Sequence, residues 1–426
     1  MNENQSDSQE KSSAKKPNLD VAENQNDLSA VAGPSKEESP SGLTKLYIDC
    51  LEELFEWLSI KDLFTLRLTC KGLKKIIDIY IKTSYPTIGR FRLEKYNFDV
   101  FRRMDASSIN LVTQLDITVE NNDCMQFEEI KTILHRIETI EISKFECEYD
   151  IYDTLLRHCE NLKFLDIIGL HTKRNECFYQ SYPTLQHVCL YEYPIDANID
   201  GMSKFEAFFR KNRQIHTIST YHGVSFLNHC ANSLDGEDGV KCKQLNMLTH
   251  YLDDDCLNEL KLWYGKSFYQ RLHLYFTQME DGTDVNELTN IGLEKICMLY
   301  LNEKLPLLPH LKEIRCGYVT DRNLFENVWN VVERLHLIGS NNGDIAWYLR
   351  HFKKLKHLSV VELDPKENII DLMVLNKERE ALAGACKTTI YVREKVYLAI
   401  KFGTSNVNFN LVELKREQSF DWKDVD

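Results

Sequence analysis

The chain has 426 residues, of which 43% are hydrophobic and 11% aromatic, so it can bury a large core. With only 9 Pro and 17 Gly, it is neither collagen-like nor mostly disordered. The formal net charge of −13, without a dense Lys/Arg block, argues against nucleic acid as a partner. No apolar run approaches the ~18 residues that span a bilayer, so we expect no membrane partner.

The 13 cysteines are scattered and form no CxxC pair, and no signal peptide is recognisable. Both observations predict reduced, mostly buried thiols in a protein of the cytoplasm and/or nucleus.

Residues 1–41 differ in composition from the rest of the chain. They contain no aromatic residue and are rich in Ser, Asn, Gln, Lys and Glu. Such a segment cannot bury enough apolar area to offset its chain entropy. We predict a disordered acidic/polar tail.

Residues 42–85 carry a helical pattern. Ser59 and Asp62 have the spacing of a capping box, which predicts a helix start after Ser59, and Gly72 marks an expected stop or bend. A hairpin of about 35 residues has too little interior for all its large apolar side chains, so some should face a partner. These side chains recur at helical spacing: Leu51, Leu54, Phe55, Leu58, Leu63, Leu66, Cys70 and Leu73.

This segment resembles an F-box, the module that docks F-box proteins onto the Skp adaptor of SCF-type cullin–RING ubiquitin ligases. The resemblance rests on Leu46, residues 52–63 (EELFEWLSIKDL), residues 66–68 and the Cys70-Lys71 pair. It departs from the family pattern at Tyr47, at Ser59-Ile60 and at Leu73, where Pro, Pro-Leu and Trp are usual. The resemblance implies that the adaptor is bound by Leu46, Leu51, Leu54, Phe55, Leu58, Ile60, Leu63, Leu66 and Cys70.

Residues 86–363 contain about eleven degenerate leucine-rich repeats. The pattern L-x-x-L-x-L recurs at intervals of 18–30 residues, close to the 20–29 residues of such repeats. Its occurrences are Val112-Leu115-Ile117, Ile137-Ile140-Ile142, Leu162-Leu165-Ile167, Leu185-Val188-Leu190, Ile215-Ile218-Thr220, Leu245-Leu248-His250, Tyr269-Leu272-Leu274, Leu293-Ile296-Met298, Leu311-Ile314-Cys316, Val332-Leu335-Leu337 and Leu355-Leu358-Val360.

Helical patterns lie between these short strands, at 127–134, 152–156, 205–209, 324–332 and 345–352. The predicted fold class is therefore α/β: an N-terminal helical module followed by a curved solenoid with parallel strands inside and helices outside. Residues 364–426 are expected to form a C-terminal cap and tail, with a helix at 369–385 and strands at 389–392 and 396–400.

An F-box followed by leucine-rich repeats resembles the F-box/leucine-rich-repeat class of substrate receptors. In that class the repeats hold a protein substrate, and strand side chains flanking the middle leucine face the concave surface. The predicted substrate-binding residues run from acidic through aromatic to basic: Asp116, Glu141, Asp166, Tyr191, Tyr221, Tyr251, Arg271, Tyr275, Arg315 and Arg334. Stacking of the tyrosines on one another as a structural stripe is the alternative.

No catalytic motif is recognisable. Gly265-Lys266-Ser267 lacks the earlier glycine of a phosphate-binding loop, and residues 253–255 (three Asp) lack the alternating ligands of a calcium loop. We therefore predict no catalytic residue, metal or cofactor, and a non-catalytic subunit of a ubiquitin ligase.

Two functions remain open. The first is a substrate receptor that binds the Skp adaptor, and through it the cullin–RING ligase, and delivers an unknown protein substrate for ubiquitination and proteasomal degradation. The second is a leucine-rich-repeat interaction scaffold without ligase association, in which the hairpin caps the first repeat.

Overall fold

The computed structural model describes residues 46–85, 87–93, 102–104, 106–119, 127–145, 157–167, 179–190, 207–221, 242–319, 321–339, 342–362, 370–403 and 406–417. The chain divides into two compact units, Met1–Tyr47 and Ile48–Asp426, and every helix and strand below belongs to the second. The predicted tail at 1–41, the helix at 152–156 and Tyr191 lie outside the described residues.

The N-terminal module has three helices where the sequence predicts two: α1 (Ile48–Phe55), α2 (Ile60–Arg67) and α3 (Lys71–Ser84). The capping box is confirmed: the Ser59 hydroxyl accepts from the Asp62 N–H at 3.2 Å, and the Asp62 carboxylate accepts from the Ser59 N–H at 3.3 Å. The predicted stop at Gly72 is wrong. Cys70 caps α3, its Sγ accepting from the Leu73 N–H, so Gly72 lies in the first turn of a new helix.

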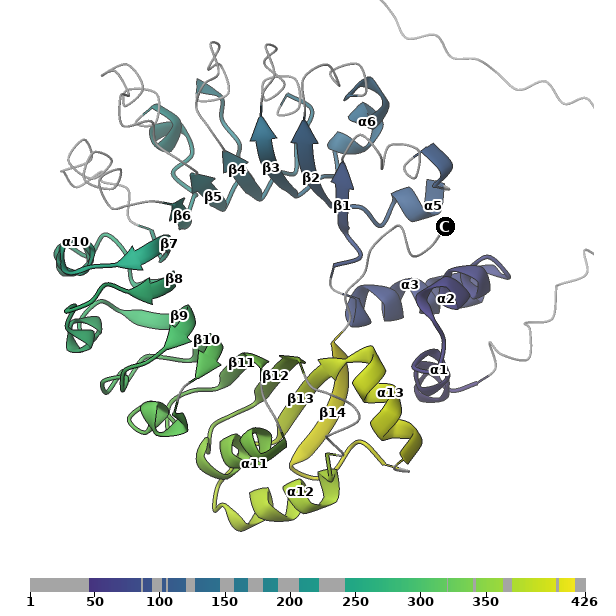
Figure 1. The fold of residues 1–426 in the computed structure, drawn as a ribbon. Coiled ribbons are helices and arrows are strands. Elements are labelled where there is room, and N and C mark those ends of the chain that lie inside the picture. The colour runs from purple at the N-terminus through teal and green to yellow at the C-terminus, as the bar shows by residue number, and fades with distance from the viewer. Residues whose placement is uncertain are drawn as a thin grey trace, which may run out of the picture. The chain divides into compact units, whose positions relative to one another are not determined.

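The rest of the described chain is built on one sheet of 14 parallel strands that follow one another in sequence order (Figure 1). All eleven predicted repeats contain a strand, and three further strands, β1, β13 and β14, extend the sheet. The strands are β1 (Arg90–Leu93), β2 (Gln114–Val119), β3 (Thr139–Phe145), β4 (Phe164–Ile167), β5 (His187–Leu190), β6 (Thr217–Tyr221), β7 (Gln244–Leu252), β8 (Arg271–Met279), β9 (Leu293–Leu301), β10 (Glu313–Val319), β11 (Arg334–Gly339), β12 (His357–Glu362), β13 (Thr388–Arg393) and β14 (Val412–Glu417).

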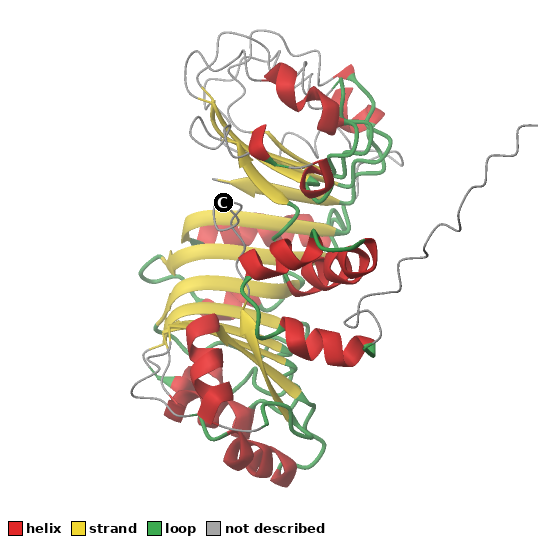
Figure 2. Cartoon of the chain, turned by 90° about the vertical axis from the view of Figure 1, so that its right-hand side faces the viewer, coloured by secondary structure: helices red, strands yellow, loops and turns green. Residues whose placement is uncertain are grey.

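The core lies behind the sheet, where the middle apolar residues of successive repeats form a ladder. Leu115 pairs with Ile140, which pairs with Leu165, and all three are buried. Each strand therefore buries its own leucine against its neighbours, as stacked repeats require. Figure 2 shows the strands lying side by side, and the predicted curved α/β solenoid is confirmed.

The sixth repeat was predicted three residues too late. Leu245 pairs with Ile218, a middle residue, so the repeat is Cys242-Leu245-Met247, all three of which are buried. A shift of three residues in a strand exchanges the two faces of the sheet. His250, predicted as a core position, is accordingly exposed.

Helices cover the outer side of the sheet (Figure 1). They are α5 (Ala106–Ile109), α6 (Phe127–Leu134), α10 (Asp254–Gly265), α11 (Asn342–His351), α12 (Leu372–Ala381) and α13 (Glu394–Gly403), with 3-10 helices η4 (Val285–Leu288) and η5 (Arg322–Phe325). Within the described ranges, no helix combines the length and apolarity needed to cross a membrane.

The helices predicted at 127–134 and 345–352 are confirmed as α6 and α11. Two other predictions are wrong. Residues 324–332 form the end of η5 and turns, and residues 396–400, predicted as a strand, lie in α13. Val396, Tyr397 and Ile400 are buried at helical spacing there, so periodicity outweighs their β propensity.

Candidate partner-binding surfaces

The helical module buries part of its predicted adaptor-binding set in its own interior. Leu51, Phe55 and Leu63 are at most 1% exposed, and the Phe55 ring meets Tyr80 edge-to-face at 5.2 Å. Because the three helices pack around them, these side chains have no exposed surface that a partner could contact. Their assignment as contact residues is corrected: they hold α1, α2 and α3 together.

An ion pair completes this interior. The Arg67 guanidinium is buried, pairs with Asp78 of α3 and donates to Ser108 Oγ of α5 at 3.2 Å. The module is thereby joined to the start of the repeats.

Other apolar side chains of the module face outward. Leu54 is 37% exposed, Leu68 70% and Ile79 61%, while Leu46, in the other unit, is also exposed. The remaining predicted contact residues are partly buried: Leu58, Ile60, Leu66 and Cys70. The exposed residues Leu68 and Ile79 are not in the predicted contact set. Ile79 could have been found, because it lies out of phase with the buried residues Leu73, Ile77 and Tyr80 of the same helix.

The C-terminal end of α1 and the residues that follow it contact the C-terminal helix α13. Lys401 Nζ pairs with Glu56 at 2.7 Å and Glu53 at 3.0 Å, and lies 4.4 Å above the Trp57 ring. Burial opposes ionisation of Lys401, but these hydrogen bonds outweigh it and raise its pKa. The Trp57 ring also packs on Phe402 at 5.3 Å. Lys401 is buried in this contact, whereas Trp57 and Phe402 stay 44% and 75% exposed.

Helix α3 in turn contacts the last strand. Arg416 of β14 donates to the Tyr80 hydroxyl at 3.1 Å and lies 5.7 Å from the centre of the Tyr85 ring. The module thus contacts α5, before the second strand of the sheet, and β14, its last strand.

A helical module joined to a parallel repeat solenoid is an architecture for holding other proteins, since both parts present extended surfaces. Residues 43–84 match the family model of the F-box domain. The chain therefore carries an F-box domain followed by a solenoid of the leucine-rich-repeat type, and F-box domains bind Skp-type adaptors of cullin–RING ligases. No similar sequence was found among curated proteins.

The concave face of the sheet begins with three carboxylates in one row, on β2, β3 and β4. Asp116 and Asp166 are each only 5% exposed, which corrects their expected display to a substrate; Glu141 is partly exposed. Arg90 pairs with both Asp116 and Glu141. Burial and the nearby charge of Glu141 raise the pKa of Asp166 to about 8.

The predicted tyrosine stripe is not continuous. Tyr221 and Tyr275 share a row, but Leu248 lies between them. Tyr251 pairs with Gln278 three residues further along the strands. The misplaced sixth repeat accounts for this error. A different exposed pair, missed in the sequence, stacks at the ends of β9 and β10: Tyr300 and Tyr318, with ring centres 5.5 Å apart.

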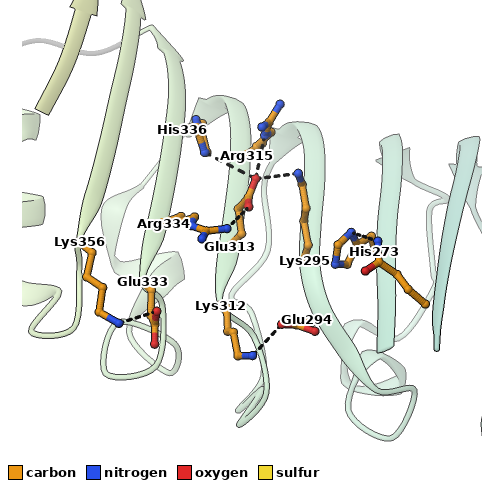
Figure 3. Close-up of polar contacts among 11 residues, drawn as sticks. His273, Glu294, Lys295, Lys312, Glu313, Arg315, Glu333, Arg334, His336 and Lys356 are labelled. Atoms are coloured by element: carbon orange, nitrogen blue, oxygen red, sulfur yellow. Dashed lines mark hydrogen bonds and ion pairs between the residues drawn. The ribbon is translucent and has the colours of Figure 1, made fainter. Parts of the chain in front are cut away.

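Basic side chains converge on one carboxylate further along the concave face (Figure 3). Glu313 Oε1 lies 2.7 Å from Lys295 Nζ and 3.0 Å from Arg315 Nε, and its Oε2 lies 3.6 Å from Arg334. Burial opposes ionisation of Glu313, but the hydrogen bonds and charges of Lys295 and Arg315 lower its pKa to about 2. The cluster contains two predicted substrate-binding residues, Arg315 and Arg334; a third, Arg271, lies 3.6 Å from Glu294 on the neighbouring strand β9.

Histidines line the same face. Burial and the charge of Arg315 lower the pKa of His336 to about 4, and burial and Arg334 lower the pKa of His357. Both rings are therefore neutral at pH 7. His357 stacks on Tyr391 of β13 at 4.2 Å, which places an aromatic ring beside the basic cluster.

In the part of the chain that the structure describes, no three His, Cys, Asp or Glu side chains are grouped to hold a metal ion. Asp253 caps α10 by accepting from the Cys256 N–H at 2.7 Å, and Asp254 and Asp255 lie in its first turn. These acids favour the positive end of the helix dipole. The absence of catalysis and cofactors stays a prediction.

Proposed function

We propose that this chain is the substrate-recognition subunit of an SCF-type E3 ubiquitin ligase. Its F-box would bind the Skp adaptor, and the concave face of its repeats would bind a protein substrate for ubiquitination and proteasomal degradation. Catalysis would come from other subunits, with the receptor raising the local concentration of substrate. The cytoplasm and nucleus are the proposed locations.

One observation carries the proposal: the F-box domain has a complete interior of its own and still exposes Leu54, Leu68 and Ile79. Several large apolar side chains exposed on a small module are a feature of interaction sites. Burying them against the helices of an adaptor would remove that area from water.

The scaffold function has an observation in its favour as well. Arg67 of α2 donates to Ser108 of α5 at the start of the repeats, which supports capping of the first repeat. At the other end, Arg416 of β14 donates to the Tyr80 hydroxyl and lies against the Tyr85 ring, so α3 also contacts the last strand. The capping contacts bury Tyr80 and Tyr85 and leave Leu54, Leu68 and Ile79 exposed, so capping and adaptor binding can both hold in one molecule.

Affinity purification of the full chain separates the two functions. In a receptor, Leu54→Asp with Leu58→Asp abolishes recovery of the Skp adaptor and leaves the repeats folded. In a pure scaffold, no adaptor is recovered with the native chain, and the same double variant lowers the melting temperature of the repeats. Leu262→Asp, at a half-exposed position of α10, is the matched control.

A further inference from the structure

The basic cluster carries more positive charge than its surroundings neutralise. Arg271, Lys295, Arg315 and Arg334 lie on adjacent strands β8–β11, and the carboxylate among them is that of Glu313. Glu294 lies near Arg271 but also pairs with Lys312. The charges of Glu294 and Lys312 cancel, so they do not change the net charge of this cluster. Four cations against one carboxylate leave an excess of three positive charges in a chain of net charge −13.

Glu313 pairs with Lys295, Arg315 and Arg334, and it leaves most donors of the two guanidinium groups available. Glu313 is ionised at neutral pH and accepts a hydrogen bond from Arg315 through Nε alone. A guanidinium has five N–H donors, and 3.6 Å to Arg334 is too long for a hydrogen bond. The side chains of Arg315 and Arg334 remain 48% and 62% exposed. Within the described residues, neither has another acidic partner at ion-pair distance.

We infer that Arg271, Lys295, Arg315 and Arg334, together called the basic surface, bind an acidic peptide segment that carries carboxylates or phosphates. The inference rests on the proposed function and names its substrate class. Neighbouring strands are about 4.8 Å apart, so the exposed guanidinium groups on β10 and β11 can bind one phosphate or successive acidic side chains, with the charge of Lys295 on β9 beside them. Arginine clusters recognise anionic peptide motifs in this way.

The flanks of the basic surface favour a peptide over nucleic acid. Tyr275 lies at one side, its ring 5.4 Å from Lys295 Nζ, and Tyr391 lies at the other, stacked on His357. Partly exposed tyrosines supply the apolar contacts that anchor a peptide. A surface of four cations on an acidic protein gives little attraction for the long phosphate backbone of a nucleic acid.

The test uses the full chain in complex with the Skp adaptor and three fluorescein-labelled peptides of one sequence. Three positions carry Ser, Glu or phosphoserine, and binding is followed by fluorescence anisotropy at low and moderate salt. The Glu or phosphoserine peptide should bind about tenfold or more tightly than the Ser peptide, and less so as salt rises. Binding of the phosphoserine peptide alone identifies phosphate as the group recognised, and binding of both shows that carboxylates suffice.

Arg315→Gln with Arg334→Gln should abolish this preference. Arg350→Gln, which removes a half-exposed guanidinium on the outer helix α11, should retain it. Equal binding of the three peptides, or a preference that survives the double variant, overturns the inference. So does a single-stranded oligonucleotide that competes better than either anionic peptide. Adaptor retention, measured on the same samples, reports separately on the proposed function, and thermal melting checks that each variant is folded.

Discussion

At the scale of single residues, two carboxylates on the same sheet face have opposite pKa shifts. Glu313 is surrounded by cations, which lower its pKa to about 2, whereas Asp166 is buried beside Glu141, which raises its pKa to about 8. Burial opposes ionisation of both groups, so the sign of each shift follows from the neighbouring charges.

Glu313→Gln should cost about 2 kcal/mol of unfolding free energy at pH 7. A carboxylate with a lowered folded-state pKa stabilises the protein above its unfolded pKa, and this contribution is lost as pH falls through the folded pKa. The difference between variant and wild type should therefore shrink between about pH 4.5 and pH 2. Urea denaturation at several pH values measures it. A difference that does not change with pH would contradict this account of the cluster.

Asp166→Asn should stabilise the protein increasingly from pH 5 to pH 8. The folded state keeps the Asp166 proton to about pH 8 while the unfolded state loses it near pH 3.8, so wild-type stability falls through this interval. Asn removes that titration. Thermal melts at pH 5 and pH 8 measure the effect. Asp116→Asn is the control: it removes the ion-pair partner of Arg90 and should lower the stability of the protein. Equal effects of the two variants at both pH values would show that Asp166 is ionised throughout.

At the scale of elements, a buried arginine ties the last helices to the sheet. The Arg379 side chain of α12 is fully buried and donates to the carbonyls of Leu349, Leu355 and Cys386 at 2.7–2.9 Å. Burial lowers its pKa to about 10, so it remains charged at neutral pH and depends on these carbonyls.

Arg379→Met should cost about 3 kcal/mol or more, because three carbonyls of the C-terminal elements lose their donor. Chemical denaturation followed by circular dichroism measures the loss. Lys377→Met, an exposed change in the same helix, should be within about 0.5 kcal/mol of wild type. Equal stability of the two variants would mean that these hydrogen bonds contribute nothing.

The elements also show how far the sequence could predict the fold. The leucine period located the eleven strands β2–β12, and the Ser59–Asp62 spacing located the start of α2, because both signals are local. The predicted position of the sixth repeat was wrong because Leu245 and Leu248 are both apolar. Only the pairing of Leu245 with Ile218 shows which of the two faces the core. The burial of Leu51 and Phe55 could not be predicted from the sequence either, because it depends on how three helices pack.

At the scale of the whole unit Ile48–Asp426, the F-box is fixed to the end of the repeats through Lys401 and Arg416. Such contacts would hold a bound substrate in a constant position relative to the adaptor. Lys401→Glu places a negative charge beside Glu53 and Glu56 and should speed amide hydrogen exchange in α1 and α13, while β7–β12 exchange as in wild type. Lys395→Glu, exposed on the same helix, is the control. Unchanged exchange in α1 would show that the contact does not restrain the module.

The central claim is that an apolar face of the F-box domain is left open for the Skp adaptor. Calorimetric titration of purified adaptor into the full chain tests it most directly. The account predicts that wild type and Leu262→Asp bind alike, whereas Leu68→Asp with Ile79→Asp binds at least about tenfold more weakly at an unchanged melting temperature. Absence of binding by the wild type, or equal binding by the double variant, would contradict it.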